Sequence, residues 1–233
     1  MRAPISVIIP VLDAAAALPA CLAALMEGLE AGVIREVILT DGGSTDDSQR
    51  IGDAVGAVWV TGAPSRGGQL RRGAAAAAGD WLMVLHADTV LPDGWSAAAL
   101  THMEGGGGAA GYFDLSFDAK SLAPRLVAGW ANLRASRFGL PYGDQGLLIS
   151  RALYDAVGGY GDMPLMEDVA MARALGRARV RPLGAVVRTS ARRYATEGYL
   201  RRGGRNLILL LRFLCGADPQ RLARAYRPKD RSS

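Results

Sequence analysis

The ten residues WLMVLHADTV, Trp81–Val90, decide the fold class of this chain. Their apolar first half, Trp81–Leu85, is bounded by turn-forming residues, as is typical of a buried central strand in a parallel sheet. In open α/β sheets ligands bind at the carboxyl ends of the strands, where Asp88 would lie. A carboxylate there, beside His86, suits a hard divalent cation that carries a diphosphate. The alternative is that Asp88 caps a turn and that His86 is a structural residue at the strand end, because Asp is common in turns.

Apolar runs alternate with helical patterns from the N-terminus to this strand. We predict strands over residues 5–10, 36–40, 57–61 and 80–85, and helices over residues 14–30, 44–55 and 67–78. Strands that alternate with helices at this spacing indicate βαβ units and a mostly parallel central sheet flanked by helices. Beyond residue 92 the rhythm loosens. There we predict strands over 110–117, 145–150 and 186–190, and helices over 122–138, 151–157, 166–175, 196–214 and 219–226.

The charge is distributed unevenly along the 233 residues. The formal net charge is +5, but residues 1–170 carry a net −8 and residues 171–233 a net +13. We therefore divide the chain into an α/β domain over 1–190, with halves 1–92 and 93–190, and a helical basic extension over 191–233. Such a tail predicts an anionic partner: phosphate, nucleic acid or an anionic membrane.

The apolar run at the N-terminus is too short for the hydrophobic region of a signal peptide. No stretch approaches the roughly 20 apolar residues that span a bilayer. The two cysteines have no metal-binding or paired motif, which favours buried free thiols and a reducing compartment. We expect a cytoplasmic protein, with peripheral contact to the inner face of the membrane as a further expectation.

Acidic residues fall at loop positions rather than inside the strands. Asp13, Asp41 and Asp88 follow three of the predicted strands, and Glu167-Asp168 opens a late helix. In a parallel sheet the first three would gather at one edge, within reach of a single ligand. Clustered like charges are costly unless a cation or a ligand compensates them, so this edge is the predicted site.

The segments that carry these residues resemble a known enzyme family. ISVIIPVLDAA, EVILTDGGSTDDS, SRGGQLRRGAAAAAGDWLMVLHADTVLP and YGDQGLLISRALYDAVGGYGDMPLMEDVAMARALG occur in the order and spacing of the family 2 nucleotide-sugar-dependent glycosyltransferases. The resemblance covers residues 3–190 and implies the Rossmann-like A-type fold and inversion of the anomeric centre. The HADT and GDQG motifs with the basic tail are most similar to a small bacterial subgroup associated with radical-enzyme and arsenosugar gene clusters.

The resemblance implies a donor pocket for a UDP- or GDP-linked sugar. Asp41 matches the carboxylate that accepts from the nucleobase imide, and Pro10, Asp13 and Gly43 shape the base and ribose pocket. Glycine suits a place where backbone approaches a nucleotide closely. Arg66 matches the basic residue near the base and the diphosphate.

The resemblance also implies the metal and the base. Asp88 matches the last aspartate of a D-x-D motif that holds Mn²⁺ or Mg²⁺ on the diphosphate, with His86 in the place of the first aspartate, a change that favours Mn²⁺. Asp168, beside Glu167, matches the general base that deprotonates the acceptor. Two further departures are Arg71 in the place of an asparagine and a TDGGS segment that lacks a second carboxylate.

Four residues are weaker candidates for contact with the acceptor or the diphosphate. Asp144 and Gln145 belong to the GDQG motif, and Arg192 and Arg193 have the bidentate geometry that matches phosphate. The alternatives are a loop before a strand for the first pair and a solvated face for the second.

The expected reaction is a single metal-assisted displacement at the anomeric carbon, onto a hydroxyl acceptor of unknown identity. One alternative is a nucleotidyltransferase of related fold, although the Gly-rich loop typical of those enzymes is absent after the first strand. Another is a membrane-surface or nucleic-acid binding module that uses the basic tail; it leaves the acidic cluster unexplained, and we expect no nucleic acid. In the tail, an apolar stripe rimmed by Arg201, Arg202, Arg205 and Arg212 predicts a packed helix whose arginine face makes weak contact with an anionic membrane. The alternative is a helix packed on the catalytic sheet with its arginines only in water.

Overall fold

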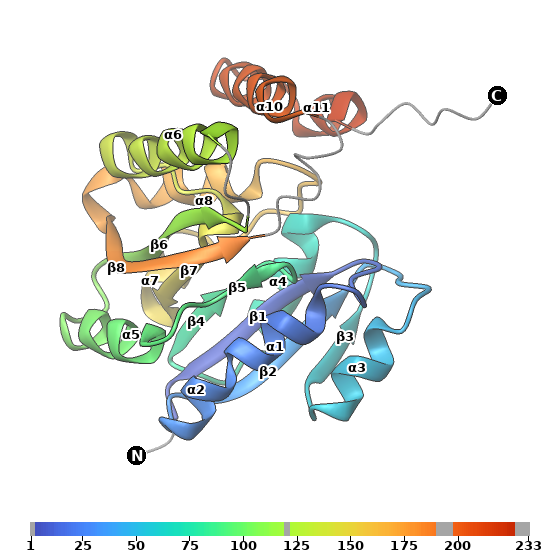
Figure 1. Cartoon of the computed structure of the whole chain (residues 1–233), viewed down its shortest axis with the longest axis vertical. Helices are drawn as coiled ribbons and strands as arrows, with labels where there is room; N and C mark the ends of the chain where they lie inside the picture. The colour runs from blue at the N-terminus through green and yellow to red at the C-terminus, as the bar shows by residue number, and fades with distance from the viewer. Residues whose placement is uncertain (1–2, 119–121, 190–197, 227–233) are drawn as a thin grey trace.

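The structure, a computed structural model, describes residues 3–118, 122–189 and 198–226 (Figure 1). In this part of the chain eight strands form one sheet in the order β3-β2-β1-β4-β7-β6-β8-β5. Their bounds are β1 Ile5–Val11, β2 Ile34–Asp41, β3 Val58–Thr61, β4 Trp81–Val84, β5 Thr89–Val90, β6 Ala110–Phe117, β7 Leu147–Ser150 and β8 Val180–Thr189.

The first four long strands run parallel, as their alternation with helices predicts. β1 pairs with β2 and β4, and β2 pairs with β3, so that Val11 lies opposite Asp41. The helices between and after them are α1 Leu18–Ala24, α2 Met26–Glu30, α3 Ser48–Ala54, α4 Arg66–Ala76 and α5 Trp95–Glu104. The carboxyl ends of β1, β2 and β4 therefore meet at one edge of the sheet.

The other half of the sheet is mixed, and the prediction of a mostly parallel sheet is wrong. β7 runs antiparallel to both β4 and β6, β8 is parallel to β6, and β5 is antiparallel to β8. An apolar run predicts that a strand is buried but does not predict its direction. The direction depends on how the connecting segment brings the chain back to the sheet, and here it places β7 antiparallel beside β4.

Helices cover both faces of the sheet. The helices in the second half of the chain are α6 Leu122–Phe138, α7 Arg151–Ala156, α8 Glu167–Leu175, α10 Tyr199–Leu214 and α11 Pro219–Tyr226, with short 3-10 turns η1 Gly143–Gln145 and η2 Arg177–Arg179. Side chains that alternate along β1 reach the two sides. Ile5, Val7 and Ile9 pack with α1 and α5, and Ile8 packs with α4 and α7. This period of two is what a strand buried on both faces requires.

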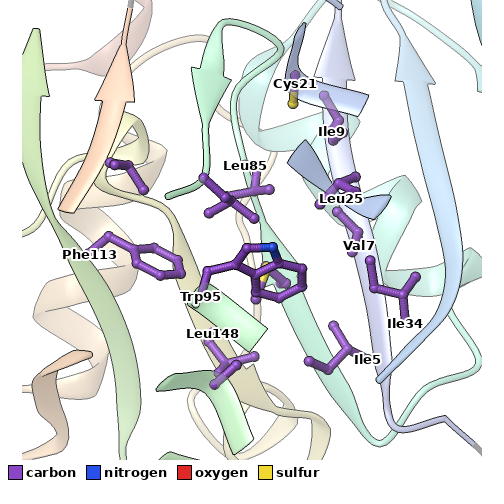
Figure 2. Close-up of a cluster of buried hydrophobic side chains, with 14 of the residues drawn as sticks. Ile5, Val7, Ile9, Cys21, Leu25, Ile34, Leu85, Trp95, Phe113 and Leu148 are labelled. Carbon is purple, nitrogen blue, oxygen red and sulfur yellow. The ribbon is translucent and has the colours of Figure 1, made fainter. Parts of the chain in front are cut away.

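Trp95 lies at the centre of the larger core (Figure 2). Its ring lies among side chains of β1, β2, β4, β6 and β7, and its indole N–H donates to the carbonyl of Ala24 at 3.0 Å. A Cβ on Gly28 would stand 2.4 Å from the ring, so glycine there lets α2 approach α5. This packing anchors the segment that follows the HADT turn.

The C-terminal helices pack against α8 and the segment that precedes it. Leu209, Leu210 and Leu222 form one buried cluster with residues that lead into and lie on α8, namely Leu165, Met166 and Val169. Arg202 is 6% exposed and donates to the Tyr226 hydroxyl at 2.7 Å. The prediction of a free face formed by Arg201, Arg202 and Arg205 is therefore wrong for Arg202. Both cysteines are free thiols; Cys21 is buried as predicted, but Cys215 is exposed, so the prediction of a buried thiol is wrong there.

No helix within the described ranges is both long enough and apolar enough to cross a bilayer.

Candidate active site

A pocket opens between the end of β4, the first turns of α4 and α8, and the C-terminal helices. Six of the residues predicted from the sequence line it together: Arg66, His86, Asp88, Asp144, Glu167 and Asp168. The other lining residues are Phe117, Tyr142, Gly143, Leu165, Met166, Thr189, Arg202, Asn206, Leu209 and Tyr226. The pocket therefore combines the predicted metal side, the predicted base and two arginines, Arg66 and Arg202.

Arg66 joins the two sides of this pocket. It is the first residue of α4, whose N-cap Ser65 accepts from the N–H of Gly68. Its Nη2 lies 2.7 Å from His86 Nε2, and its Nε lies 3.4 Å from Glu167 Oε1. The same Arg66 nitrogen lies 3.3 Å from His86 Nδ1, so the guanidinium contacts the imidazole ring near both of its nitrogens.

The glycines after Arg66 serve contacts within the protein. A Cβ on Gly67 would lie 2.1 Å from the carbonyl oxygen of Gly161, and the Gly67 N–H donates to the Met163 carbonyl. The Ser65 hydroxyl donates to Asp162 at 2.7 Å. The loop before α8 is thus seated on the start of α4, which fixes Arg66 relative to the predicted base.

The two carboxylates at the start of α8 have different surroundings. Met166, which precedes them, has φ of +68°, a left-handed conformation that is uncommon outside glycine and that turns the chain into the helix at this point. Asp168 lines the pocket, and its Oδ2 accepts from the Gly143 N–H at 2.8 Å. A Cβ on Gly143 would stand 2.3 Å from His86 Nε2. Glycine at this position therefore brings Asp168 and His86 to one loop.

Glu167 is the more buried of the pair, at 3% exposed. Burial raises its pKa to about 7 against the opposing effect of Arg66, and Asp168 raises it further. Its Oε2 has no hydrogen-bond partner among the described residues. Glu167 thus holds Arg66, whereas Asp168 has the more open carboxylate.

Asp144 presents a second buried carboxyl oxygen to the pocket. Its Oδ1 is buried and has no hydrogen-bond partner within the described ranges. Burial raises the pKa of Asp144 to about 6. The positive charge of Arg134 opposes this rise, and the negative charges of Asp168 and Asp88 add to it. The side chain is therefore ready to accept from, or donate to, a ligand group.

This shift predicts a pH-dependent stability. The folded pKa of about 6 exceeds the unfolded value, so the folded chain binds the extra proton and its stability falls as the pH rises from about 4 through 6. We expect Asp144→Asn to remove this loss. The free energy of unfolding of the variant, relative to that of wild type, should therefore rise by about 2 kcal/mol between pH 4.5 and pH 7.5. Urea unfolding at the two pH values measures it. Parallel pH profiles for the two proteins would contradict the assignment.

Of the five predicted nucleotide-binding residues, Arg66 lines this pocket, and the other four lie at the ends of β1 and β2 and in the two loops that follow these strands. Pro10, Asp13, Asp41 and Gly43 do not line the pocket as the described residues define it. Asp41 is 5% exposed and accepts from the Gly43 N–H and from both the N–H and the hydroxyl of Ser44.

Asp13 ties the two loops together. Its carboxylate accepts from the Thr45 N–H at 2.8 Å, and its own N–H donates to the Ser44 hydroxyl. Its φ of +48° is a second uncommon left-handed conformation. Behind the loops, the buried amide of Gln69 donates to the carbonyls of Val11 and Thr40. The structure thus brings Pro10, Asp13, Asp41 and Gly43 together at this sheet edge, and we call these four residues the rim.

The structure separates the weaker candidates. Gln145 is completely buried, and its amide donates to the Phe113 carbonyl and accepts from the Tyr142 N–H, so it positions the loop instead of facing the pocket. Arg192 and Arg193 lie outside the described residues.

Several pocket residues have no signal in the sequence. Arg202 and Asn206 come from α10 and Tyr226 from α11, and they contribute to the wall opposite the sheet. Tyr142 lies with its ring centroid 3.3 Å from the guanidinium carbon of buried Arg134. An apolar helical pattern indicates that one face of a helix is buried but not which segment it packs against. Local sequence therefore could not predict that α10 and α11 contribute residues to the pocket.

Asp88 and His86 are the pocket residues that could hold a metal, since both line it from the turn after β4. Among the described residues no three His, Cys, Asp or Glu side chains form a ready metal cage. A metal here would take two protein ligands at most from this turn and the rest from a bound diphosphate.

Comparison with known proteins identifies the fold. Residues 6–138 match glycosyl transferase family 2. Glucosyl-3-phosphoglycerate synthase from Mycobacterium tuberculosis, solved with Mn²⁺, UDP-glucose and phosphoglyceric acid, is 24% identical with a TM-score of 0.63, over 92% of this chain and 80% of that one. The same enzyme with Mn²⁺, UDP and glucosyl-3-phosphoglycerate is 22% identical with a TM-score of 0.62, over 92% and 81%. No match was found among curated proteins.

Proposed function

Because the chain belongs to glycosyl transferase family 2, and so is a nucleotide-sugar-dependent glycosyltransferase, we propose that it inverts the anomeric centre of a UDP-linked sugar as it moves the sugar to a hydroxyl acceptor. One observation carries this proposal. Asp88, Arg66 and Asp168 line one pocket at the carboxyl ends of the parallel strands, where a diphosphate and an acceptor would meet.

The donor side follows from the charges. Asp88, with His86, would hold a divalent metal on the diphosphate, and a carboxylate with an imidazole favours Mn²⁺ over Mg²⁺. When bound, such a metal supplies Lewis-acid stabilisation of the leaving group. Arg66 adds a guanidinium that would donate to phosphate oxygens. To do so, it would give up its contact with His86.

The acceptor side follows from Asp168. As the acceptor oxygen forms its bond to the anomeric carbon, the bond from that carbon to the phosphate oxygen breaks, and its electron pair leaves with the diphosphate. The acceptor proton passes to the Asp168 carboxylate. The Gly143 N–H orients this carboxylate, and Glu167 holds Arg66 beside it. Attack from the face opposite the leaving group inverts the centre.

The base and ribose are proposed to lie against the rim formed by Pro10, Asp13, Asp41 and Gly43. The carboxylate of Asp41 is engaged by Ser44, so a nucleobase imide would take the place of the Ser44 hydroxyl, the more mobile of its donors. Gly43, with φ of +101°, supports the turn that a side chain would strain. Arg192 and Arg193 remain proposed diphosphate contacts and Asp144 a proposed acceptor contact.

The finer assignments rest on the sequence. The likeness to the radical-enzyme and arsenosugar subgroup rests on HADT and GDQG, and the division at residue 190 rests on charge. The nucleotidyl transfer that a related fold supports is less favoured, since the family of this chain transfers sugars. A cytoplasmic location, with weak contact to the inner membrane face, is likewise proposed.

A thermal-shift panel of nucleotides with and without Mn²⁺ tests the donor assignment. UDP or its sugars at 100 times Kd would stabilise the fold by about 2.7 kcal/mol, roughly 5–10 °C in a chain of this size. We expect this rise with Mn²⁺ and a smaller one with EDTA. Adenine nucleotides should leave Tm unchanged, and an equal rise with ADP would contradict the proposal.

A further inference from the structure

Two neighbouring helices expose apolar side chains in rows. On α6 these follow helical spacing of three or four and belong to Leu122, Leu126, Trp130 and Leu133; on α10 they are Leu207, Ile208, Leu211 and Leu214. The exposed fractions are large for such residues, 68% for Leu126, 45% for Trp130 and 52% for Leu211. Large apolar side chains that are exposed together on neighbouring helices mark an interaction site.

The two rows meet at one groove. α10 packs on α6, and the two helices lie side by side at one end of the molecule, followed by α11 (Figure 1). Trp130 and Leu207 line the same groove between α6 and α10, and both are also exposed. Tyr142, Asp144 and Asn206 line both this groove and the active-site pocket. The apolar face therefore leads to the reaction centre.

The charged side chains on the three helices of this end are all basic. α6, α10 and α11 contain no Asp or Glu, and they expose Arg125, Arg137, Arg201, Arg212, Arg221 and Arg224. In a helix, Arg201 and Arg212 lie next to Ile208 on the border of the apolar row. An apolar row bordered by arginines, with a tryptophan in it, matches the interface of an anionic bilayer.

A second copy of the chain fits this face poorly. A two-fold interface would place this face on itself, so that arginines would oppose arginines with no acidic side chain from the three helices between them. Anionic headgroups supply the missing charge.

We propose that the face formed by α6, α10 and α11 docks on an anionic bilayer surface, with the apolar rows in the headgroup region and the groove open to lipid. Docking stands apart from the transfer reaction. If the proposed function also holds, the acceptor hydroxyl belongs to an amphiphile whose apolar part enters through the groove.

Co-sedimentation of the full chain with phosphatidylglycerol vesicles tests docking. We expect pelleting at low salt, little with pure phosphatidylcholine, and a marked loss as salt screens the charges. The double substitution Leu126→Gln/Leu211→Gln should weaken binding about tenfold or more, because two exposed apolar side chains leave the bilayer. Leu29→Gln/Val55→Gln, which changes two exposed apolar residues on the other half of the chain, is the matched control and should bind as wild type.

A second pair of variants tests the charge. Arg201→Gln/Arg212→Gln should lose about fivefold per arginine, whereas Arg35→Gln/Arg50→Gln, with the same change in net charge, should not. Brominated lipid should quench the tryptophan fluorescence of wild type, because Trp130 would lie in the headgroup region, and should quench Trp130→Phe much less. This measurement leaves the charge of the face unchanged. Thermal shifts with UDP on the same variants report on the donor site separately.

Three outcomes would overturn the proposal: no pelleting at any salt, equal losses in the control pairs, or a solution mass of two chains that falls to one in Leu126→Gln/Leu211→Gln. The last would assign the face to a second copy.

Discussion

An Asp168→Asn enzyme should transfer sugar about a hundredfold or more slowly than wild type, because a positioned base contributes roughly 10²–10⁴-fold. The substitution keeps the size of the side chain and one carbonyl oxygen to accept from Gly143, but removes the basic oxygen. Donor binding should change little, since the base acts on the acceptor. Steady-state kinetics and a UDP thermal shift, measured on the same preparation, separate the two effects.

Glu167→Gln is the matched control for this experiment. Glu167 contacts Arg66 from a buried position, so its neutral analogue should weaken donor binding more than it slows the transfer step. If Asp168→Asn kept more than about a tenth of the wild-type rate while Glu167→Gln abolished transfer, the adjacent carboxylate would be the base.

Asp88→Ala should abolish the dependence of UDP binding on metal. Wild type is expected to bind UDP about tenfold or more tightly with Mn²⁺ than with EDTA, since the metal joins the protein to the diphosphate. Without the Asp88 carboxylate the two affinities should converge on the weaker value. Titration calorimetry at fixed salt measures both.

Asp93→Ala is the control, because this exposed carboxylate follows five residues later and does not line the described pocket. Equal affinity with Mn²⁺ and EDTA in wild type, together with no loss in Asp88→Ala, would rule out a metal role for this turn. His86→Gln distinguishes the second ligand: a loss with Mn²⁺ alone assigns His86 to the metal, and an equal loss with EDTA assigns it to Arg66.

The residues that local patterns could find are those that follow a strand directly. Asp88 and Asp41 come after apolar runs, and parallel strands bring their carboxyl ends to one edge, so sequence predicted their common edge. The finer arrangement differs. Asp88 lines the pocket with Arg66 and Asp168, whereas Asp41 uses its oxygens within its own loop, because Ser44 and Gly43 fold back on it.

The amino-acid sequence by itself determined the strands other than β5 and the first half of β8, most helices and the carboxylates at the sheet edge, because period and turn chemistry act over a few residues. Only the tertiary structure decided that β7 enters antiparallel beside β4, that Arg66 bridges His86 and Glu167, and that α10 and α11 close the pocket. These contacts join segments far apart in the chain. The packing of α10 and α11 gains its free energy from burying one apolar face against another, whereas Arg66 makes an ion pair and a polar contact with side chains from other segments. A periodic pattern in either segment does not specify its partner.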